Sequence, residues 1–566
     1  SLAKAVAASG SIPSIFSPVE IEGQLITDGG VTNNYPVEEI KKRGVDYIIG
    51  VDVQDSLVDR TKLKTAFEIL TQINNLRTIK DMETKYDKTD LYIKPDITEF
   101  TILSFDEGEA IIEQGELEAK KYVEDFKKIT SQQQKVATVK KKVVLEDSIH
   151  INKISIKGNS AYPRNYIRGK LRIETNSKIS YKKLNKGINN LSATGNFAKI
   201  EYELIPKQNG KKDLVLTIRE SKVKTLIKGS LHYDELYRFA ALVNLTHKSL
   251  FLKNDIVSLD LIAGDNFRYN FNYYIDKGSY WSIGLKSRYN QFNQGVPFSF
   301  IEDNFNLENF NVNKVEVEFS DFTNQFYAET FFIKQFKLGL GLEHKYTNSD
   351  TETFIEDENN EEFPVTVLEQ SNLFSAFGYL EYDKYDNAYF PSKGAHFTGD
   401  FHWYLLDSKS SFDFEPFSIF RGSAGYAFSP LNKFSVRLQS DLGFRLGRTH
   451  MNSLDFFLGG YGNHFINNIQ PLLGYDFLYV GGDSYVKALA EVDYELYPKH
   501  HLVATYNIAN VKDNLFNSID FFSLPKYTGL ALGYGIETFV GPVEVKYSYS
   551  PERDQSEWFF SLGFWF

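Results

Sequence analysis

The residues whose types and spacing could do chemistry lie near the start of the chain, in the stretch LITDGGVTNNYP. Asp28 follows a short apolar strand pattern and precedes Gly29 and Gly30, which favour a sharp turn because glycine tolerates positive φ. Pro36 suits the first turn of a helix, and Asn34 is a candidate cap for that helix. On this motif alone, a structural turn aspartate is the stronger interpretation, and a catalytic carboxylate is the alternative.

Other candidate sites are weaker. His500 and His501 are adjacent in a strand-turn pattern, so they should point to opposite faces and cannot readily bind one metal ion together. Asp383 and Asp386 could hold calcium, although a solvated turn is the favoured interpretation. The 566 residues contain no cysteine, which excludes disulfides, thiolate metal sites and a cysteine nucleophile among them. No histidine precedes His150, so a Ser-His-Asp triad cannot be built within the first part of the chain.

Composition narrows the class of protein. The net charge is −11 and the isoelectric point is about 5.6, which gives no support for a nucleic-acid partner. Aromatic residues make up 15 %, with 35 Tyr and 47 Phe, an excess that suits surfaces in contact with lipid headgroups. No apolar stretch reaches the ~18 residues of a transmembrane helix, and no signal peptide is recognisable. The opening residues, SLAKAVAASG, have the pattern of a helix interior, so we expect a fragment or a processed form.

Residues 1–130 mix helix and strand patterns. VDYIIGVDV predicts a buried parallel strand, and the preceding VEEIKKRG has helix spacing that stops at Gly44. Longer helices are expected at LKTAFEILTQINNLRTIKDMETKY and EGEAIIEQGELEAKKYVEDFKKI, with the short strand TDLYIKPDI between them. This alternation indicates an α/β domain with a parallel sheet. Residues 131–145 are polar and basic and predict a linker, which is either a solvated spacer or a contact for anionic headgroups.

A small α+β domain is expected at residues 146–222. IHINKISIKGN alternates with period two and ends in a Gly-Asn turn, and two short helix patterns follow it. A hairpin is expected around Asn209 and Gly210. The predicted order is therefore strand, helix, helix, strand, strand.

From residue 225 to residue 566 the pattern changes to strands. Apolar and polar side chains alternate in HFTGDFHWYLL, FSVRLQSDLGFRLG and PVEVKYSYSP, which fits both a soluble sandwich and a membrane barrel. The length of about 340 residues, the presence of all four Trp in this region and the aromatic last strand favour the barrel. We expect an antiparallel transmembrane β-barrel of roughly 16 strands, with the polar stretch 347–372 as a long loop.

Residues 1 to about 130 resemble the C-terminal half of the patatin-like phospholipase domain. The family's Ala-Ser, Ile-Pro, Phe-x-Pro, Asp-Gly-Gly and Asn-x-Pro elements correspond here to Ala8-Ser9, Ile12-Pro13, Phe16 to Pro18, Asp28 to Gly30 and Asn34 to Pro36. Members use a Ser–Asp dyad, so the resemblance implies that Asp28 is the dyad aspartate and acts as the base. It implies no metal and no cofactor.

The serine of this family lies in a Gly-x-Ser-x-Gly elbow, a motif that occurs nowhere in the 566 residues. The glycine-rich loop that supplies oxyanion donors in the family is missing as well. We expect both upstream of Ser1, so the printed chain should be inert and the activity of the full protein depends on that upstream part.

Residues 146–222 resemble a polypeptide-transport-associated (POTRA) domain, in the order of elements and in ISIKGNSAYP. The barrel resembles the bacterial surface antigen family, in DNAYFPSKGAHF and in the final Phe566. A loop of that family carries an Arg-Gly-Tyr or Arg-Gly-Phe tip in the lumen, and its counterpart here is PLLGYDF, with Leu473 at the arginine position. Members of that family assemble or translocate outer-membrane and secreted proteins. Because Leu473 lacks the guanidinium of their arginine, we do not expect this chain to share that activity on the resemblance alone.

The order patatin, POTRA, barrel resembles the patatin subclass of type V secreted proteins. The first hypothesis is a lipid acyl hydrolase of phospholipase A type, anchored in the outer membrane of a Gram-negative bacterium. Its POTRA domain would be periplasmic, its hydrolase periplasmic or at the surface, and its partners membrane phospholipids and the bilayer; whether it forms a homodimer is open. The alternative is a barrel that assembles or translocates unfolded polypeptides, with an inactive or accessory patatin module.

Overall fold

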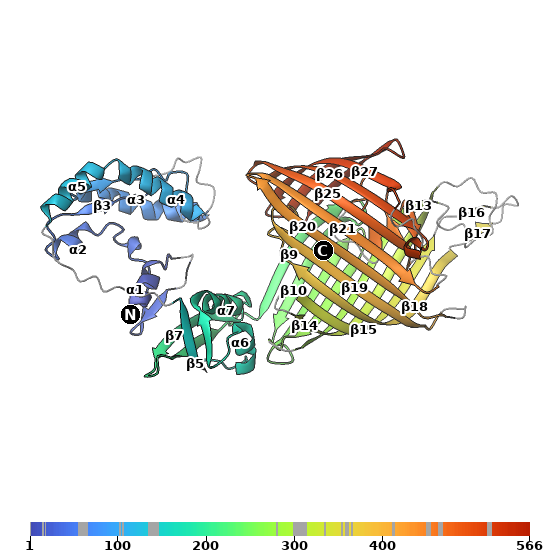
Figure 1. The fold of residues 1–566 in the computed structure, drawn as a ribbon, viewed down its shortest axis with the longest axis horizontal. Coiled ribbons are helices and arrows are strands. Elements are labelled where there is room, and N and C mark those ends of the chain that lie inside the picture. The colour runs from blue at the N-terminus through green and yellow to red at the C-terminus, as the bar shows by residue number, and fades with distance from the viewer. Residues whose placement is uncertain are drawn as a thin grey trace. The chain divides into compact units, whose positions relative to one another are not determined.

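The computed structural model consists of two compact units, residues 1–143 and residues 144–566 (Figure 1). The structure describes residues 2–13, 16, 18–54, 66–100, 104, 107–133, 147–278, 281–297, 314–332, 336–351, 355–356, 362–363, 366–409, 414–448, 454–461, 468–517 and 523–565. Most of the expected linker, including its lysine run, lies outside the described residues, and so does Phe566.

The first unit is an α/β arrangement of short strands and longer helices. β1 (Val19–Ile21) and β2 (Gln24–Ile26) form an antiparallel hairpin, and β3 (Ile49–Val51) pairs in parallel with β4 (Leu91–Ile93), as predicted. The helices are α1 (Leu2–Ser9), α2 (Val37–Lys41), α3 (Ala66–Tyr86), α4 (Gly108–Lys120) and α5 (Val123–Gln132), and a 3-10 turn, η1 (Gly29–Val31), follows β2. None of the described helices is both long enough and apolar enough to cross a membrane.

The prediction that β3 is buried is only half right. Gly50 is buried beneath Tyr35, so closely that an added Cβ would lie 1.6 Å from the Tyr35 hydroxyl. Ile49 and Val51 point the other way and are 46 % and 51 % exposed. The strand therefore alternates in burial. Tyr35, Val37 and Ile48, with Met82 packed against them, cover only one face of the β3–β4 pair.

The helix boundaries were predicted with mixed success. Gly44, which follows α2, has φ 76°, as expected of a glycine that stops a helix. The single helix expected over EGEAIIEQGELEAKKYVEDFKKI is two helices, α4 and α5. They separate because Tyr122 has φ −104° and ψ 16°, outside the α-helical range.

The second unit begins with a small α+β domain. Its elements are β5 (Ser148–Lys157), α6 (Arg164–Leu171), β6 (Ser177–Ser180), α7 (Tyr181–Ala193), β7 (Phe197–Pro206) and β8 (Lys212–Glu220), so the predicted order is right apart from the added short β6. The sheet order is β6-β5-β8-β7, and β7 and β8 are joined by the predicted hairpin, in which Gly210 has φ 73°. Fully buried Leu and Ile side chains from the sheet and both helices form its core.

Glu220, the last residue of β8, fixes the loop that leads into α6. Its carboxylate accepts hydrogen bonds from the backbone N–H groups of Ser160, Ala161 and Tyr162 at 2.8–3.0 Å. Partial burial by itself would raise the pKa of Glu220, but these hydrogen bonds to the charged form outweigh burial and lower the pKa.

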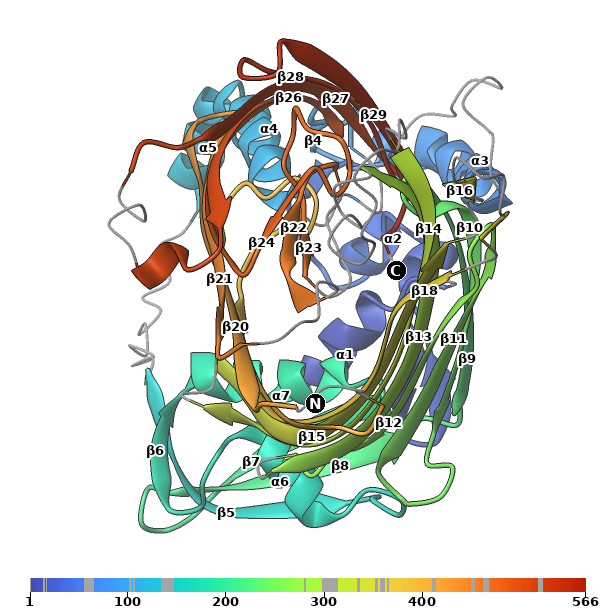
Figure 2. The same ribbon diagram turned by 90° about the vertical axis from the view of Figure 1, so that its right-hand side faces the viewer.

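Sixteen of the described strands close into one antiparallel barrel, as predicted (Figures 1 and 2). In chain order they are β9 (Thr225–Asp234), β10 (Arg238–Lys248), β11 (Asp255–Gly264), β12 (Arg268–Ile275), β13 (Ser282–Pro297), β14 (Lys314–Phe332), β15 (Phe336–Thr351), β18 (Thr366–Asp383), β19 (Gly394–Asp407), β20 (Phe417–Leu431), β21 (Phe434–Leu446), β25 (Ser484–Tyr497), β26 (His500–Lys512), β27 (Tyr527–Thr538), β28 (Gly541–Ser550) and β29 (Gln555–Gly563). The ring closes where β29 pairs with β9, through Leu562 with Tyr233 and Gly563 with His232. This seam is two residue pairs long, much shorter than the ladders of ten and eight pairs that join β9 to β10 and β28 to β29.

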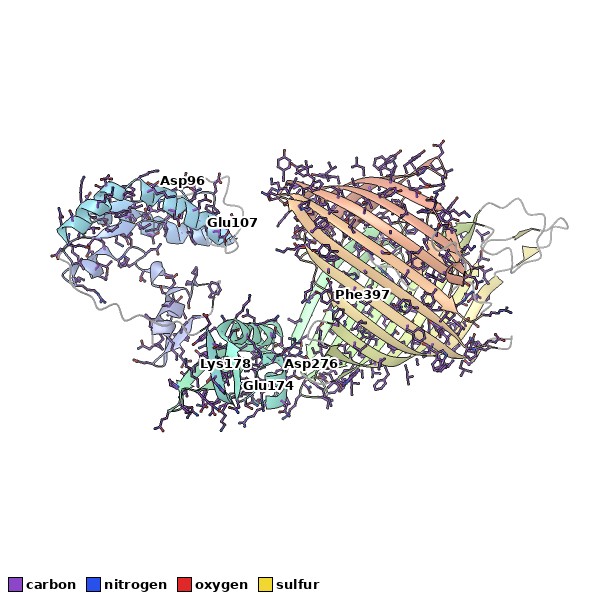
Figure 3. The ribbon with its side chains drawn as sticks, in the orientation of Figure 1. Asp96, Glu107, Glu174, Lys178, Asp276 and Phe397 are labelled. Atoms are coloured by element: carbon purple, nitrogen blue, oxygen red, sulfur yellow. The ribbon has the colours of Figure 1, made fainter. Side chains whose placement is uncertain are left out.

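The barrel has an apolar outer face and a polar inner face. Along β19, Phe401, Trp403 and Leu405 point outward and are 41–49 % exposed, whereas His402, between them, is 7 % exposed. Figure 3 shows side chains covering the outside of the wall, with Phe397 of β19 among them. This alternation is that of a membrane barrel, whose outer wall meets lipid and whose interior is polar.

Three of the four Trp lie on the outer wall, the face on which an interfacial girdle was expected. Trp281, Trp403 and Trp558 are 44–65 % exposed on the outer wall. Trp565 is not on the outer wall, because its ring turns into the lumen and lies 4.6 Å from the ring of His232.

The polar stretch 347–372 was expected to be one long loop, and this is wrong in part. The pairing of β15 with β18 continues to Thr351 and Thr366, so both ends of the stretch belong to barrel strands. Between them, β16 (Ile355–Glu356) and β17 (Glu362–Phe363) form a short hairpin.

Two lysines, one from each side, are among the contacts between the small α+β domain and the barrel. Lys170 of α6 lies 2.6 Å from the carboxylate of Asp276, in the turn after β12. Lys248, at the end of β10, donates hydrogen bonds to the Thr194 carbonyl and to Asn196 Oδ1, both at 3.0 Å. These contacts join the domain to one end of the barrel.

Leu342, on β15, is 62 % exposed on the outer wall and tests the lipid-facing assignment. Leu342→Arg should destabilise the membrane-inserted barrel by about 2–4 kcal/mol, the cost of a cation at the middle of the lipid-facing wall. Thr398→Arg places the same side chain on the polar inner face of β19 and should cost much less. Heat-dependent gel migration of the reconstituted protein measures both, and equal losses would contradict the assignment.

Candidate functional site

Asp28 lies where β2 ends and the η1 turn begins. Its Oδ1 accepts a hydrogen bond from the Gly30 N–H at 2.8 Å, and its own N–H donates to the Ser11 carbonyl at 3.1 Å. The other carboxylate oxygen accepts no hydrogen bond from the residues that the structure describes. The side chain is half-buried, so one oxygen is fixed and the other is available to a partner.

The carbonyl of Ser11 positions this turn. It accepts the Asp28 N–H and also the Thr27 hydroxyl, at 2.6 Å. Ser11 is itself buried just after α1, and its hydroxyl donates to the Ala7 carbonyl at 2.7 Å. The end of α1 and the strand end that carries Asp28 are thereby held together.

The reason for the glycines in this turn differs from the predicted one. Neither Gly29 nor Gly30 is among the described glycines with positive φ. Gly30 is instead close to its neighbours, because an added Cβ would lie 2.7 Å from Asn34 Oδ1 and 3.2 Å from Asp28 Oδ1. Asn34 does not cap the next helix, since α2 has Pro36 at its N-cap position with no side-chain hydrogen bond.

Asp52 is a buried carboxylate that the sequence analysis did not single out. It follows β3, is 3 % exposed, and accepts hydrogen bonds from the Tyr92 hydroxyl and from Lys94 Nζ at 3.1 Å. Burial and the hydrogen bond to Asp52 raise the pKa of Tyr92. These partners tie β3 to β4, so Asp52 is explained by the fold.

The weaker candidates have structural partners. His500 Nδ1 lies 2.7 Å from the Tyr534 hydroxyl, whereas His501 points to the lumen and lies 2.8 Å from Asp493, so the two rings face opposite sides as predicted. Asp386 accepts hydrogen bonds from the N–H groups of Ser392 and Lys393 at 2.9 and 3.0 Å.

A second candidate site is the barrel lumen, which holds a folded piece of the chain (Figure 2). The lumen segment, defined as residues 454–461 and 468–482, contains β22 (Phe456–Leu458), β23 (Ile469–Gln470) and β24 (Val480–Gly482), with β22 in the middle of a three-stranded sheet. Its large side chains pack against inward-facing barrel side chains in two apolar clusters. The ring of Phe456, for example, lies 5.0 Å from that of Tyr485 on β25.

Leu473 belongs to this segment and is 5 % exposed. Its side chain packs in the cluster that contains Phe477 and Phe559, where an unpaired arginine would be costly. Its backbone is held by Asn507 of β26, a residue that the sequence identified only as part of an alternating strand.

Charged side chains on the inner wall are paired with opposite charges, four of the six pairs below across adjacent strands, one across the intervening β18 and one within β28. Nitrogen–oxygen distances are 2.7–3.3 Å in the pairs Lys345–Asp321, His402–Glu343, Arg421–Asp400, Arg437–Glu491, Lys487–Asp441 and Lys546–Glu544. Because these groups lie on strands whose other face meets lipid, pairing within the lumen is what makes them tolerable.

The family model of the OMP85 superfamily matches residues 212–566, more than half of the chain. The chain belongs to this superfamily. A solved structure of BamA from Haemophilus ducreyi lacking POTRA domains 1–3 is similar at a TM-score of 0.52 and 14 % identity, over 73 % of this chain and 84 % of that chain, which shows a shared fold. Membership and the apolar outer wall indicate that this OMP85 barrel lies in an outer membrane.

The other two regions match families of their own. A POTRA model, described as a surface antigen variable number repeat, matches residues 149–221, and a patatin-like phospholipase model matches residues 1–41. Lysophospholipase NTE1 of Candida albicans is 45 % identical over 58 residues, which are 10 % of this chain and 4 % of that protein. The Candida glabrata protein is 29 % identical over 137 residues, 19 % of this chain and 8 % of that protein. The chain therefore spans less than a tenth of either relative.

The pair of Lys487 and Asp441 can test whether the charges in the lumen of this OMP85 barrel depend on their partners. Both side chains are buried, at most 6 % exposed. Lys487→Met should lower stability by about 3–5 kcal/mol, because it leaves Asp441 buried without its counter-charge. Lys487→Met combined with Asp441→Asn should recover most of the loss, and Lys253→Met, at an exposed turn, should have little effect. Thermal unfolding in detergent measures all three, and a double variant as unstable as the single one would contradict the pairing.

Proposed function

We propose that the protein is a lipid acyl hydrolase of patatin type, anchored in the outer membrane by its OMP85 barrel. The observation that carries this proposal is the Asp28 turn within the matched patatin-like phospholipase segment, with one carboxylate oxygen fixed by Gly30 and the other free of described partners. A base that must accept a proton from a hydroxyl group needs such a fixed carboxylate with an open oxygen.

The reaction follows from a Ser–Asp dyad. A serine hydroxyl attacks the ester carbonyl of a phospholipid, and Asp28 accepts the hydroxyl proton. Collapse of the tetrahedral intermediate releases the lysophospholipid, which takes up that proton, and leaves an acyl-serine that water hydrolyses to a fatty acid. The proposal requires a Gly-x-Ser-x-Gly serine, which is absent from the 566 residues, so the intact protein must supply it from residues that precede Ser1.

The barrel supports the choice of a lipid substrate. A hydrolase tethered to a membrane protein works at a high effective concentration of the surrounding phospholipids. In this proposal the POTRA domain lies in the periplasm, at the end of the barrel that carries Asp276 and Lys248.

Asp28→Asn in the intact protein should lower the rate of fatty-acid release from phosphatidylglycerol vesicles by roughly 10²–10⁴-fold, because the amide cannot accept the serine proton. Glu22→Gln, an exposed carboxylate in the adjacent β1–β2 turn, is the matched control and should leave the rate unchanged. Unchanged turnover of a folded Asp28→Asn protein would refute the assignment of Asp28.

A second candidate function is the handling of unfolded polypeptides, with the patatin part as an inactive or accessory module. The observation in its favour is β7, a ten-residue strand at the edge of the POTRA sheet, where an extended chain could add as a further strand. Leu473 at the arginine position counts against it. Depletion of the protein without loss of any other outer-membrane protein would exclude this function.

A further inference from the structure

The lumen segment reaches from one wall of the barrel to the opposite wall. Phe457 and Ile469 pack in the cluster that contains Phe292 of β13, whereas the backbone of Leu473 is bound by Asn507 of β26. In the ring of sixteen strands, β13 and β26 are eight positions apart, so these two contacts lie across the lumen from each other. A segment attached to both walls obstructs the lumen at this level. Figure 2 shows its strands β22, β23 and β24 inside the ring.

Asn507 binds both polar groups of one residue in the segment. Its Oδ1 accepts the Leu473 N–H at 2.9 Å, and its Nδ2 donates to the Leu473 carbonyl at 3.3 Å. Gly529 on β27 makes this approach possible, because an added Cβ would lie 1.8 Å from the Leu473 oxygen. Asn507 is 2 % exposed, so water does not compete for these hydrogen bonds.

A guanidinium also reaches the lumen segment, but from a different part of the chain. Arg553, in the turn between β28 and β29, donates to the Gly474 carbonyl at 3.3 Å. Its Cζ lies 4.6 Å from the centroid of the Tyr479 ring, within the range of a cation–π contact. Glu557 lies 3.3 Å from Arg553 Nη1 and balances the charge.

Two further contacts hold the same stretch. Lys487 Nζ donates to the Pro471 carbonyl at 3.1 Å. The hydroxyl of Tyr475, which is fully buried, donates to Glu552 at 2.9 Å and accepts the Thr528 N–H at 3.1 Å. Residues 471–479 are thus bound to side chains or backbone of β25, β26, β27 and the β28–β29 turn.

We infer that the lumen segment is a fixed closure, held by Asn507 and Arg553 in place of an arginine at position 473, and that the barrel is a closed anchor and not a conduit. Passage through the lumen would require the segment to leave it, which would break these hydrogen bonds together and expose both apolar clusters. The inference goes beyond the proposed hydrolase and holds whether or not Asp28 is catalytic.

Ion conductance of the full chain in planar lipid bilayers tests the closure. The unmodified protein should stay closed, and Asn507→Ala combined with Arg553→Ala should raise the open fraction by about ten-fold or more, because both anchoring groups are lost. Tyr506→Ala, a neighbour of Asn507 that is 46 % exposed on the outer wall, should leave conductance unchanged. Conductance of the unmodified protein equal to that of the double variant would overturn the inference.

Thiol labelling gives a readout that does not depend on the double variant folding. The chain has no cysteine, so Leu473→Cys introduces a single thiol at a position that is 5 % exposed. In otherwise unmodified protein a small maleimide should label it far more slowly than Leu524→Cys, at a position that is 91 % exposed. Equal labelling rates would show that the segment leaves its place and would also overturn the inference.

Discussion

Closure of the strand ring is the constraint on which the rest of the second unit depends. Strands in lipid have no water to satisfy their backbone N–H and C=O groups, so a membrane-spanning sheet must close on itself. Closure turns every second side chain inward, and in this chain the inward rows of β14 to β28 carry both charges and aromatic rings. The paired charges and the packed lumen segment are consequences of that geometry, because neither an unpaired charge nor an empty apolar surface would be stable there.

The lumen segment shows how a lost contact can be replaced from elsewhere in the fold. Leu473 cannot make the charged contact that the bacterial surface antigen resemblance implied. Arg553 approaches the neighbouring Gly474 carbonyl from another turn, and Asn507 binds the Leu473 backbone directly. The loop tip is therefore held by two separate elements, as expected if the barrel serves as the anchor of the proposed hydrolase.

Patterns with a period of two predicted the barrel well, because lipid and lumen impose opposite chemistry on successive residues of β19 and its neighbours. Asp28 was placed correctly at the end of a strand, but the reason for its glycines was not, since the close approach of Asn34 to Gly30 depends on how the turn after β2 folds back on itself. The contacts of Arg553 and the inward turn of Trp565 depend on which strands meet across the ring. No local sequence pattern specifies which distant strands face each other across the lumen, so these contacts could not be predicted from the sequence.

The most direct test of a membrane-anchored hydrolase is to label the intact protein with a fluorophosphonate, a reagent that reacts with nucleophilic serines, and to map the modified peptide. We expect one labelled serine, in a Gly-x-Ser-x-Gly peptide, and loss of labelling in the Asp28→Asn variant. A folded, intact protein that takes up no label would contradict the proposed hydrolase and would favour the second candidate, a barrel that handles unfolded polypeptides.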